Sequence, residues 1–133
     1  MAPAEDTPLS AQQLDAVLGS LPPARIGLAA AGRPADVLAR IGWVFAWNWD
    51  SGPLEIAAVL RSWEDRLGAR LLQVGFAEIR LLAERPPRTL QAAEHVAAEH
   101  CAFCDGCAGK FLRDIPGVAT ELLATPIWTF WWD

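Results

Sequence analysis

The stretch LEIAAVLRSWEDRLGARLLQVGFAEIRLLAE, residues 54–84, decides the fold because its hydrophobic period changes from helical to strand-like. Over Leu54 to Leu67 the apolar residues recur at spacings of three and four, which predicts an amphipathic helix. Gly68 follows, at the position where many helices end in a left-handed residue. Residues 69–74 and 77–84 then predict two strands, and the short link between them indicates an antiparallel hairpin.

The flanking segments extend this pattern on both sides. Upstream, large aromatic residues alternate with smaller ones from Trp43 to Trp49, and a period of two predicts a strand. Downstream, Thr89 can cap a helix that runs to about Phe103. A further short helix is expected over Pro116 to Ala124, and Ile127 to Asp133 predicts a last strand.

The main elements follow the order β-α-β-β-α-β, which is the split βαβ arrangement. We therefore expect an α+β fold, specifically a ferredoxin-like βαββαβ sandwich. In it, a four-stranded antiparallel sheet carries its helices on one face, and the last strand lies beside the first. Residues 1–41 are expected to form a tail and short N-terminal helices, over Ala11–Gly19 and after Pro34, and residues 42–133 the α+β domain.

Composition limits the classes of function. The 133 residues fit one domain, and a hydrophobic content of 53% excludes a chain that is disordered throughout. A net charge of −5 with a single lysine disfavours a nucleic-acid partner, which needs clustered cations. No run of about 18 apolar residues is present, so no membrane span is expected. The acidic N-terminal segment does not resemble a secretory signal, so we expect a cytoplasmic protein.

Four short motifs occur in order along the chain: LRSWEDRLGAR (60–70), RPPRT (85–89), AAEHCAFC (97–104) and WTFWWD (128–133). This series resembles the DUF4253 family of bacterial proteins over roughly residues 42–133. The family is a domain of unknown function, so the resemblance implies no activity. Its matching positions here are Trp63, Pro86, Glu99, His100, Cys104, Trp128, Trp131, Trp132 and Asp133. Family members usually carry Pro-Asp after the cysteine that matches Cys104, so Cys101 and Cys107 look peculiar to this chain.

One candidate metal site is the set His100, Cys101, Cys104 and Cys107, because zinc prefers four nitrogen or sulfur ligands. His100 and Cys104 are four residues apart and share one helix face with Ala93, Val96 and Ala97. Two alternatives stay open. These residues can be ordinary core residues, or Cys104 and Cys107 can form a redox pair. Redox cysteines, however, normally lie at the N-terminal end of a helix, and these lie at the C-terminal end. An odd number of cysteines argues against a disulfide framework.

A second candidate site is a surface for a partner, made of Trp49, Trp131, Trp132 and Asp133. Trp131 and Trp132 are consecutive on a strand and face opposite sides of the sheet, so one of them must lie away from the main helices. Glu94 and Glu99 are expected on a solvated helix face.

We therefore expect a non-enzymatic binding module with a protein partner, and assign no catalytic residue. The alternatives are a zinc-binding protein, and a small enzyme with His100 as base and Cys104 as nucleophile. The cofactor, if any, and the oligomeric state stay open.

Overall fold

The computed structural model describes residues 8–43, 53–104 and 115–132. Its helical elements are α1 (Ala11–Gly19), the 3-10 turn η2 (Pro34–Asp36), α2 (Val37–Arg40), α3 (Pro53–Leu67), α4 (Leu90–Phe103) and α5 (Ile115–Ala124). Its strands are β1 (Ala69–Val74), β2 (Glu78–Ala83) and β3 (Ile127–Trp131). These elements confirm the helices and strands predicted within the described ranges. The strand predicted over 43–49 lies outside them, apart from Trp43.

The three strands form one antiparallel sheet in the order β1-β2-β3. The hairpin predicted from the sequence pairs β1 with β2, and the register shifts between Leu71 and Gln73, where a bulge interrupts the ladder. On the other side of β2, Leu81 lies opposite Trp128 and Ile79 opposite Phe130. The central strand is therefore β2.

The prediction of a four-stranded, ferredoxin-like sheet is wrong. That topology places a strand between the hairpin and the last strand, but β2 pairs directly with β3. It would also make these two strands parallel, whereas they are antiparallel. The reason is the number of helices between them. One crossover helix returns the chain parallel to the preceding strand, and α5, which packs against α4, reverses the direction once more.

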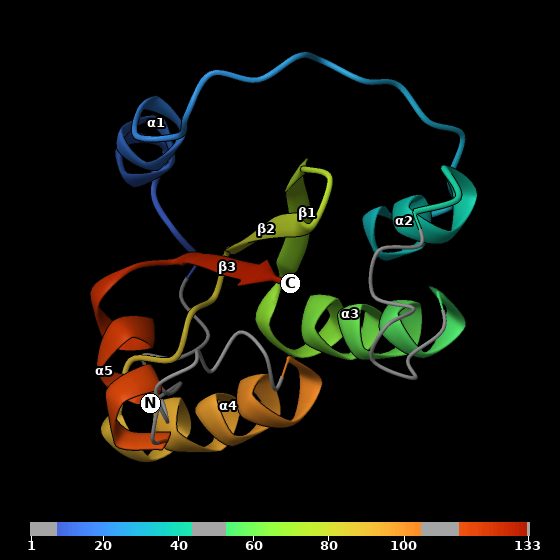
Figure 1. Ribbon diagram of the computed structural model, residues 1–133. Coiled ribbons are helices and arrows are strands. Elements are labelled where there is room, and N and C mark those ends of the chain that lie inside the picture. The colour runs from blue at the N-terminus through green and yellow to red at the C-terminus, as the bar shows by residue number, and fades with distance from the viewer. Residues whose placement is uncertain (1–7, 44–52, 105–114, 133) are drawn as a thin grey trace.

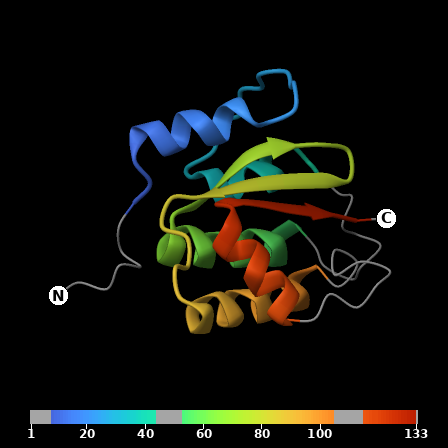
Figure 2. The same ribbon diagram turned by 90° about the vertical axis from the view of Figure 1, so that its left-hand side faces the viewer.

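Helices α3, α4 and α5 lie on one side of the sheet, and α1 lies on the other (Figures 1 and 2). The buried core fills the space between the sheet and the three helices, and Trp63 of α3 is at its centre with 0% of its surface exposed. Its ring stacks on Phe130, with centroids 5.5 Å apart, and meets Trp128 edge-on at 5.7 Å. Aromatic pairs in this geometry add to the energy of burial. The aromatic residues of β3 therefore hold α3 on the sheet.

Helix α1 contributes little to this core. A capping box between Ser10 and Gln13 starts the helix, but none of its residues is buried. A segment from Leu21 to Arg33, here called the arm, leads from α1 to η2 and arches over the β1–β2 hairpin (Figure 1). Within the described ranges, no helix has the length and apolar character needed to cross a membrane.

Candidate functional site

Helix α4 carries the candidate residues on the face that meets the sheet. Thr89 caps the helix by accepting a hydrogen bond from the backbone amide of Ala92 at 3.2 Å. The buried positions that follow recur at helical spacing and are Ala93, Val96, Ala97 and His100. Cys104, at the end of the helix, is also fully buried. The prediction that His100 and Cys104 share the inward face is confirmed.

The imidazole of His100 lies within a cluster of aromatic rings. The ring centroids of Trp128, Phe130 and Trp63 are 4.6, 4.8 and 4.9 Å from its own. Burial lowers the pKa of His100 to about 3, and the nearby Glu99 carboxylate offsets this only in part. His100 is therefore neutral at physiological pH, where its ring nitrogens can donate or accept hydrogen bonds but carry no charge.

Glu99 precedes His100 on α4 and contacts α3 instead of the sheet. Its Oε2 accepts a hydrogen bond from the indole nitrogen of Trp63 at 2.6 Å. Arg66 donates to both carboxylate oxygens, at 3.0 and 2.6 Å. The hydrogen bonds from Arg66 are the main reason that the pKa of Glu99 is lowered, with a further contribution from Trp63 and opposition from burial.

The expectation that Glu99 belongs to a solvated face is therefore corrected, because Glu99 joins α4 to α3. The sequence does contain an indication of this contact, but the spacing of residues on α4 alone does not reveal it. Trp63 and Arg66 are three residues apart and so point to the same side of α3. Two hydrogen-bond donors on one helix side favour an acidic partner on a neighbouring helix.

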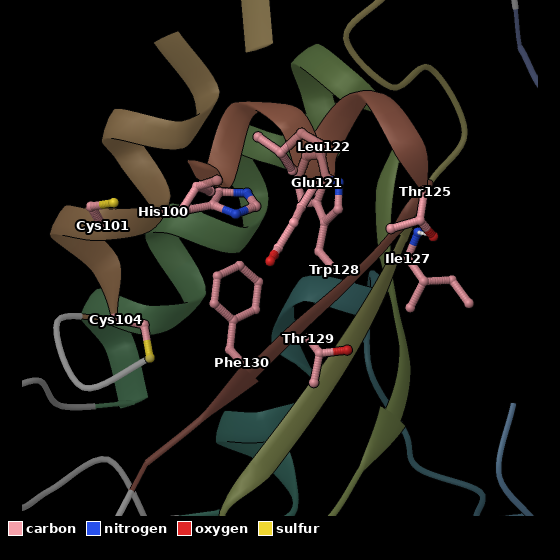
Figure 3. A pocket seen from close by; sticks show the side chains of 11 residues that line it. His100, Cys101, Cys104, Glu121, Leu122, Thr125, Ile127, Trp128, Thr129 and Phe130 are labelled. Carbon is pink, nitrogen blue, oxygen red and sulfur yellow. Dashed lines mark hydrogen bonds between the residues drawn. The ribbon is translucent and has the colours of Figure 1, made fainter. Parts of the chain in front are cut away.

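A cavity of about 70 Å³ lies where α4 and α5 meet β3. Figure 3 shows His100 from α4, Glu121 from α5, and Trp128 and Phe130 from β3 converging on it. His100 Nε2 and Trp128 Nε1 are both buried and have no hydrogen-bond partner among the described residues. Each such group costs about 1–3 kcal/mol of stability when it stays unpaired. Native structures contain few of them, and each calls for a physical explanation.

The candidate metal ligands are only partly described. Cys101 is half-buried. Cys104 is disulfide-bonded, and its sulfur lies 3.4 Å from the carbonyl oxygen of Trp131. Cys107 lies outside the described residues. In the part of the chain that the structure describes, no group of three or more His, Cys, Asp or Glu side chains is placed to hold a metal. The zinc site thus stays a prediction.

The pairing of His100 as base with Cys104 as nucleophile also stays a prediction. A sulfur in a disulfide bond carries no thiolate for nucleophilic attack. A histidine with a pKa of about 3 is in addition a weak base.

Four residues were predicted to form a partner surface. One of them lies in the core, one is half-buried on the sheet, and two lie outside the described residues. Trp132 is 3% exposed and packs edge-on against Trp43, with ring centroids 5.4 Å apart. Trp131 is half-buried and faces the other side of the sheet, as its position next to Trp132 predicts. Trp49 and Asp133 lie outside the described residues. The indole of Trp132 therefore stabilises the core and does not present a surface.

An open groove of about 1250 Å³ lies between the arm and the β1–β2 hairpin, and no pattern in the sequence predicted it. Of the ten exposed large apolar side chains in the described ranges, four line this groove: Ile26, Leu28, Ile41 and Val74. Ile26 and Leu28 are the extreme cases, with 102% and 104% of their reference surface exposed.

Comparison with family models matches residues 25–133 to the domain of unknown function DUF4253. The match begins before the boundary expected at residue 42 and includes most of the arm. Searches of curated proteins and of solved structures found no match. Since the matched segment spans far more than half of the chain, this chain belongs to the DUF4253 family.

Proposed function

We propose that this domain is a binding module that holds an apolar segment of a protein partner in the groove between the arm and the hairpin. The observation that carries the proposal is the concentration of exposed apolar side chains there, led by Ile26 and Leu28. Scattered apolar residues are normal on a protein surface, but a contiguous group is typical of an interaction site. A partner segment would remove these side chains from water.

The size of the groove favours a macromolecular ligand. Pockets for small molecules measure about 300–1,000 Å³ and enclose most of their ligand. This groove is larger, with a volume of about 1250 Å³, and the arm forms one of its walls. Among the residues that the structure describes, one hydrogen bond reaches a backbone group of residues 22–32, donated by the Gln73 side chain to the Pro22 carbonyl at 3.2 Å. The other backbone groups of that stretch can therefore pair with a partner segment.

The arm is anchored at both ends, which keeps the groove open. Near its start it is held by the hydrogen bond from Gln73. At its end, Arg33 forms ion pairs with Glu64 at 3.3 Å and with Asp65 at 2.6 Å, both on α3. Ion pairs at this exposure contribute little to stability individually, but together they fix the direction of the arm. A preformed groove lowers the entropic cost of binding.

The test compares the native chain with the double variant Ile26→Asp/Leu28→Asp. Both positions are fully exposed, so the variant should keep its fold. Leu54→Asp is the matched control, because Leu54 is 78% exposed and lies outside the groove. The dye anilinonaphthalene sulfonate should fluoresce with the native chain and with the control, and much less with the double variant.

Proteins captured from a lysate of the source organism should then be quantified for all three chains. The proposal predicts a partner that the native chain and the Leu54→Asp control retain in equal amount and that the double variant loses. Equal capture by the double variant would show that the groove is not the binding site.

A further inference from the structure

The cavity between α4, α5 and β3 lies apart from the groove and has its own chemistry. His100 and Trp128 both line it, and their Nε2 and Nε1 atoms lack partners among the described residues. The two residues are 8% and 2% exposed, and their rings meet edge-on with centroids 4.6 Å apart. Two buried polar atoms without partners, on adjacent rings beside one cavity, point to a ligand that the cavity is built to receive.

We propose that this cavity binds a small uncharged molecule whose hydrogen-bond acceptor, of the carboxamide or ketone class, pairs with the indole N–H of Trp128. An indole nitrogen can only donate, so the ligand must present an acceptor there. The adjacent His100 can complete the arrangement from Nε2, because a neutral imidazole nitrogen accepts or donates according to its tautomer.

The absence of charge follows from the surroundings of these atoms. His100 and Trp128 are 8% and 2% exposed, so a ligand group that pairs with them is removed from water. Among the described residues that line the cavity there is no lysine or arginine, and the carboxylate of Glu121, which also lines it, repels an anion. Moving an unpaired ion out of water costs far more than moving an amide or a carbonyl group. A carboxylate or phosphate is therefore a poor ligand for this cavity.

The shape of the cavity suits a flat group. The rings of His100, Trp128 and Phe130 line it together (Figure 3). A single water needs about 10–15 Å³ of such space, so a cavity of about 70 Å³ accepts a group of several heavy atoms. Planar amides and carbonyl groups pack well against aromatic faces.

Acetamide and acetate are matched probes, since they have the same size and shape and differ in charge. The indole N–H resonances of Trp128 and Trp43 can be followed in proton–nitrogen correlation spectra while each probe is added at millimolar concentration. Trp43 is the internal control, because its indole nitrogen is bonded to the Gly75 carbonyl at 3.0 Å and lies outside the cavity. We expect acetamide to shift the Trp128 resonance saturably, and acetate to leave both resonances in place.

Trp128→Phe, which removes the donor, should weaken acetamide binding at least tenfold. Should this variant not fold, magnetisation transfer from the acetamide methyl group to the Trp128 and His100 ring protons of the native chain gives the same answer. Lack of a saturable shift with acetamide would overturn the proposal and leave water as the occupant. If acetate shifts the Trp128 resonance and binds with the same affinity as acetamide, the assignment of an uncharged ligand is overturned.

Discussion

The indole nitrogen of Trp63 lies 2.6 Å from the Oε2 atom of Glu99, and this hydrogen bond joins the centre of the core to helix α4. The carboxylate is held in turn by Arg66. Hydrogen bonds to a charged group are stronger than those between neutral groups. Trp128, whose ring contacts that of Trp63, has no such bond among the described residues. The indole nitrogens of these two neighbouring buried tryptophans thus differ in hydrogen bonding, and the effect on stability can be measured.

Trp63→Phe should destabilise the fold more than Trp128→Phe. Both residues are buried, at 0% and 2% exposure, so the loss of packing is similar. Trp63→Phe also removes a hydrogen bond to a carboxylate, worth about 1.5–3 kcal/mol. Trp128→Phe instead removes an unpaired buried donor, which offsets part of the packing loss. Urea unfolding of both variants measures the difference, and equal losses would mean that the Trp128 indole nitrogen has a partner.

Glu99→Ala should cost about 2 kcal/mol, because it leaves the indole N–H of Trp63 buried without an acceptor. Glu99→Gln keeps an acceptor and removes only the ion pair with Arg66, so it should cost less than about 1 kcal/mol. Glu94→Ala on the same helix is the control and should change stability by no more than about 0.5 kcal/mol. Equal losses for the alanine and glutamine variants would contradict the role given to the Trp63 bond.

The contribution of Glu99 to the stability of the fold depends on pH. Since the pKa of Glu99 is lowered in the folded state, its contribution is present above the ordinary glutamate pKa of 4.5. The contribution is lost as the pH falls through the folded-state pKa. The difference in stability between the native chain and Glu99→Gln should therefore shrink in acid, and a constant difference would contradict this coupling.

His100 should make the fold less stable as the pH falls from about 6.5 toward about 3. In this range the unfolded chain binds a proton at His100 and the folded chain does not, so acid favours unfolding. The slope from this residue is at most about 1.4 kcal/mol per pH unit. His100→Phe should flatten the slope, with His100→Gln as the alternative if the larger ring does not fit. If the imidazole of His100 itself titrates near 6.5 in NMR spectra, His100 is not buried as described.

Gly68→Ala should destabilise the fold more than Gly42→Ala. Both glycines have a positive φ, of 61° and 70°, where any other residue costs about 1–2 kcal/mol. A Cβ atom at position 68 would also lie 3.1 Å from the Cβ atom of Glu84, whereas a Cβ atom at position 42 would meet no atom of the described residues within 4 Å. Thermal unfolding compares the stability of the two variants. An equal loss of stability would show that the chain around Glu84 moves to accommodate the added Cβ atom without destabilising the fold.

Local pattern was sufficient to predict the helices, the hairpin and the inward face of α4. The reason is that burial on a helix or strand repeats with the period of that element, and the repeat is visible in the sequence around His100. The spacing of apolar residues from Leu54 to Leu67 likewise predicted the helix, and the glycine at position 68 predicted its end. These features depend on residues close to one another in the chain.

Long-range geometry decided the remaining features. The antiparallel pairing of β2 with β3 depends on the direction in which two packed helices return the chain, and no local period encodes a direction. The hydrogen bond between Trp63 and Glu99 joins residues 36 positions apart, so a helical wheel placed Glu99 in solvent when it was drawn without its neighbouring helix. The groove under the arm exists because distant segments enclose a space. Pairing, hydrogen-bond partners and open space belong to the tertiary structure, since each is a relation between segments that the sequence presents separately.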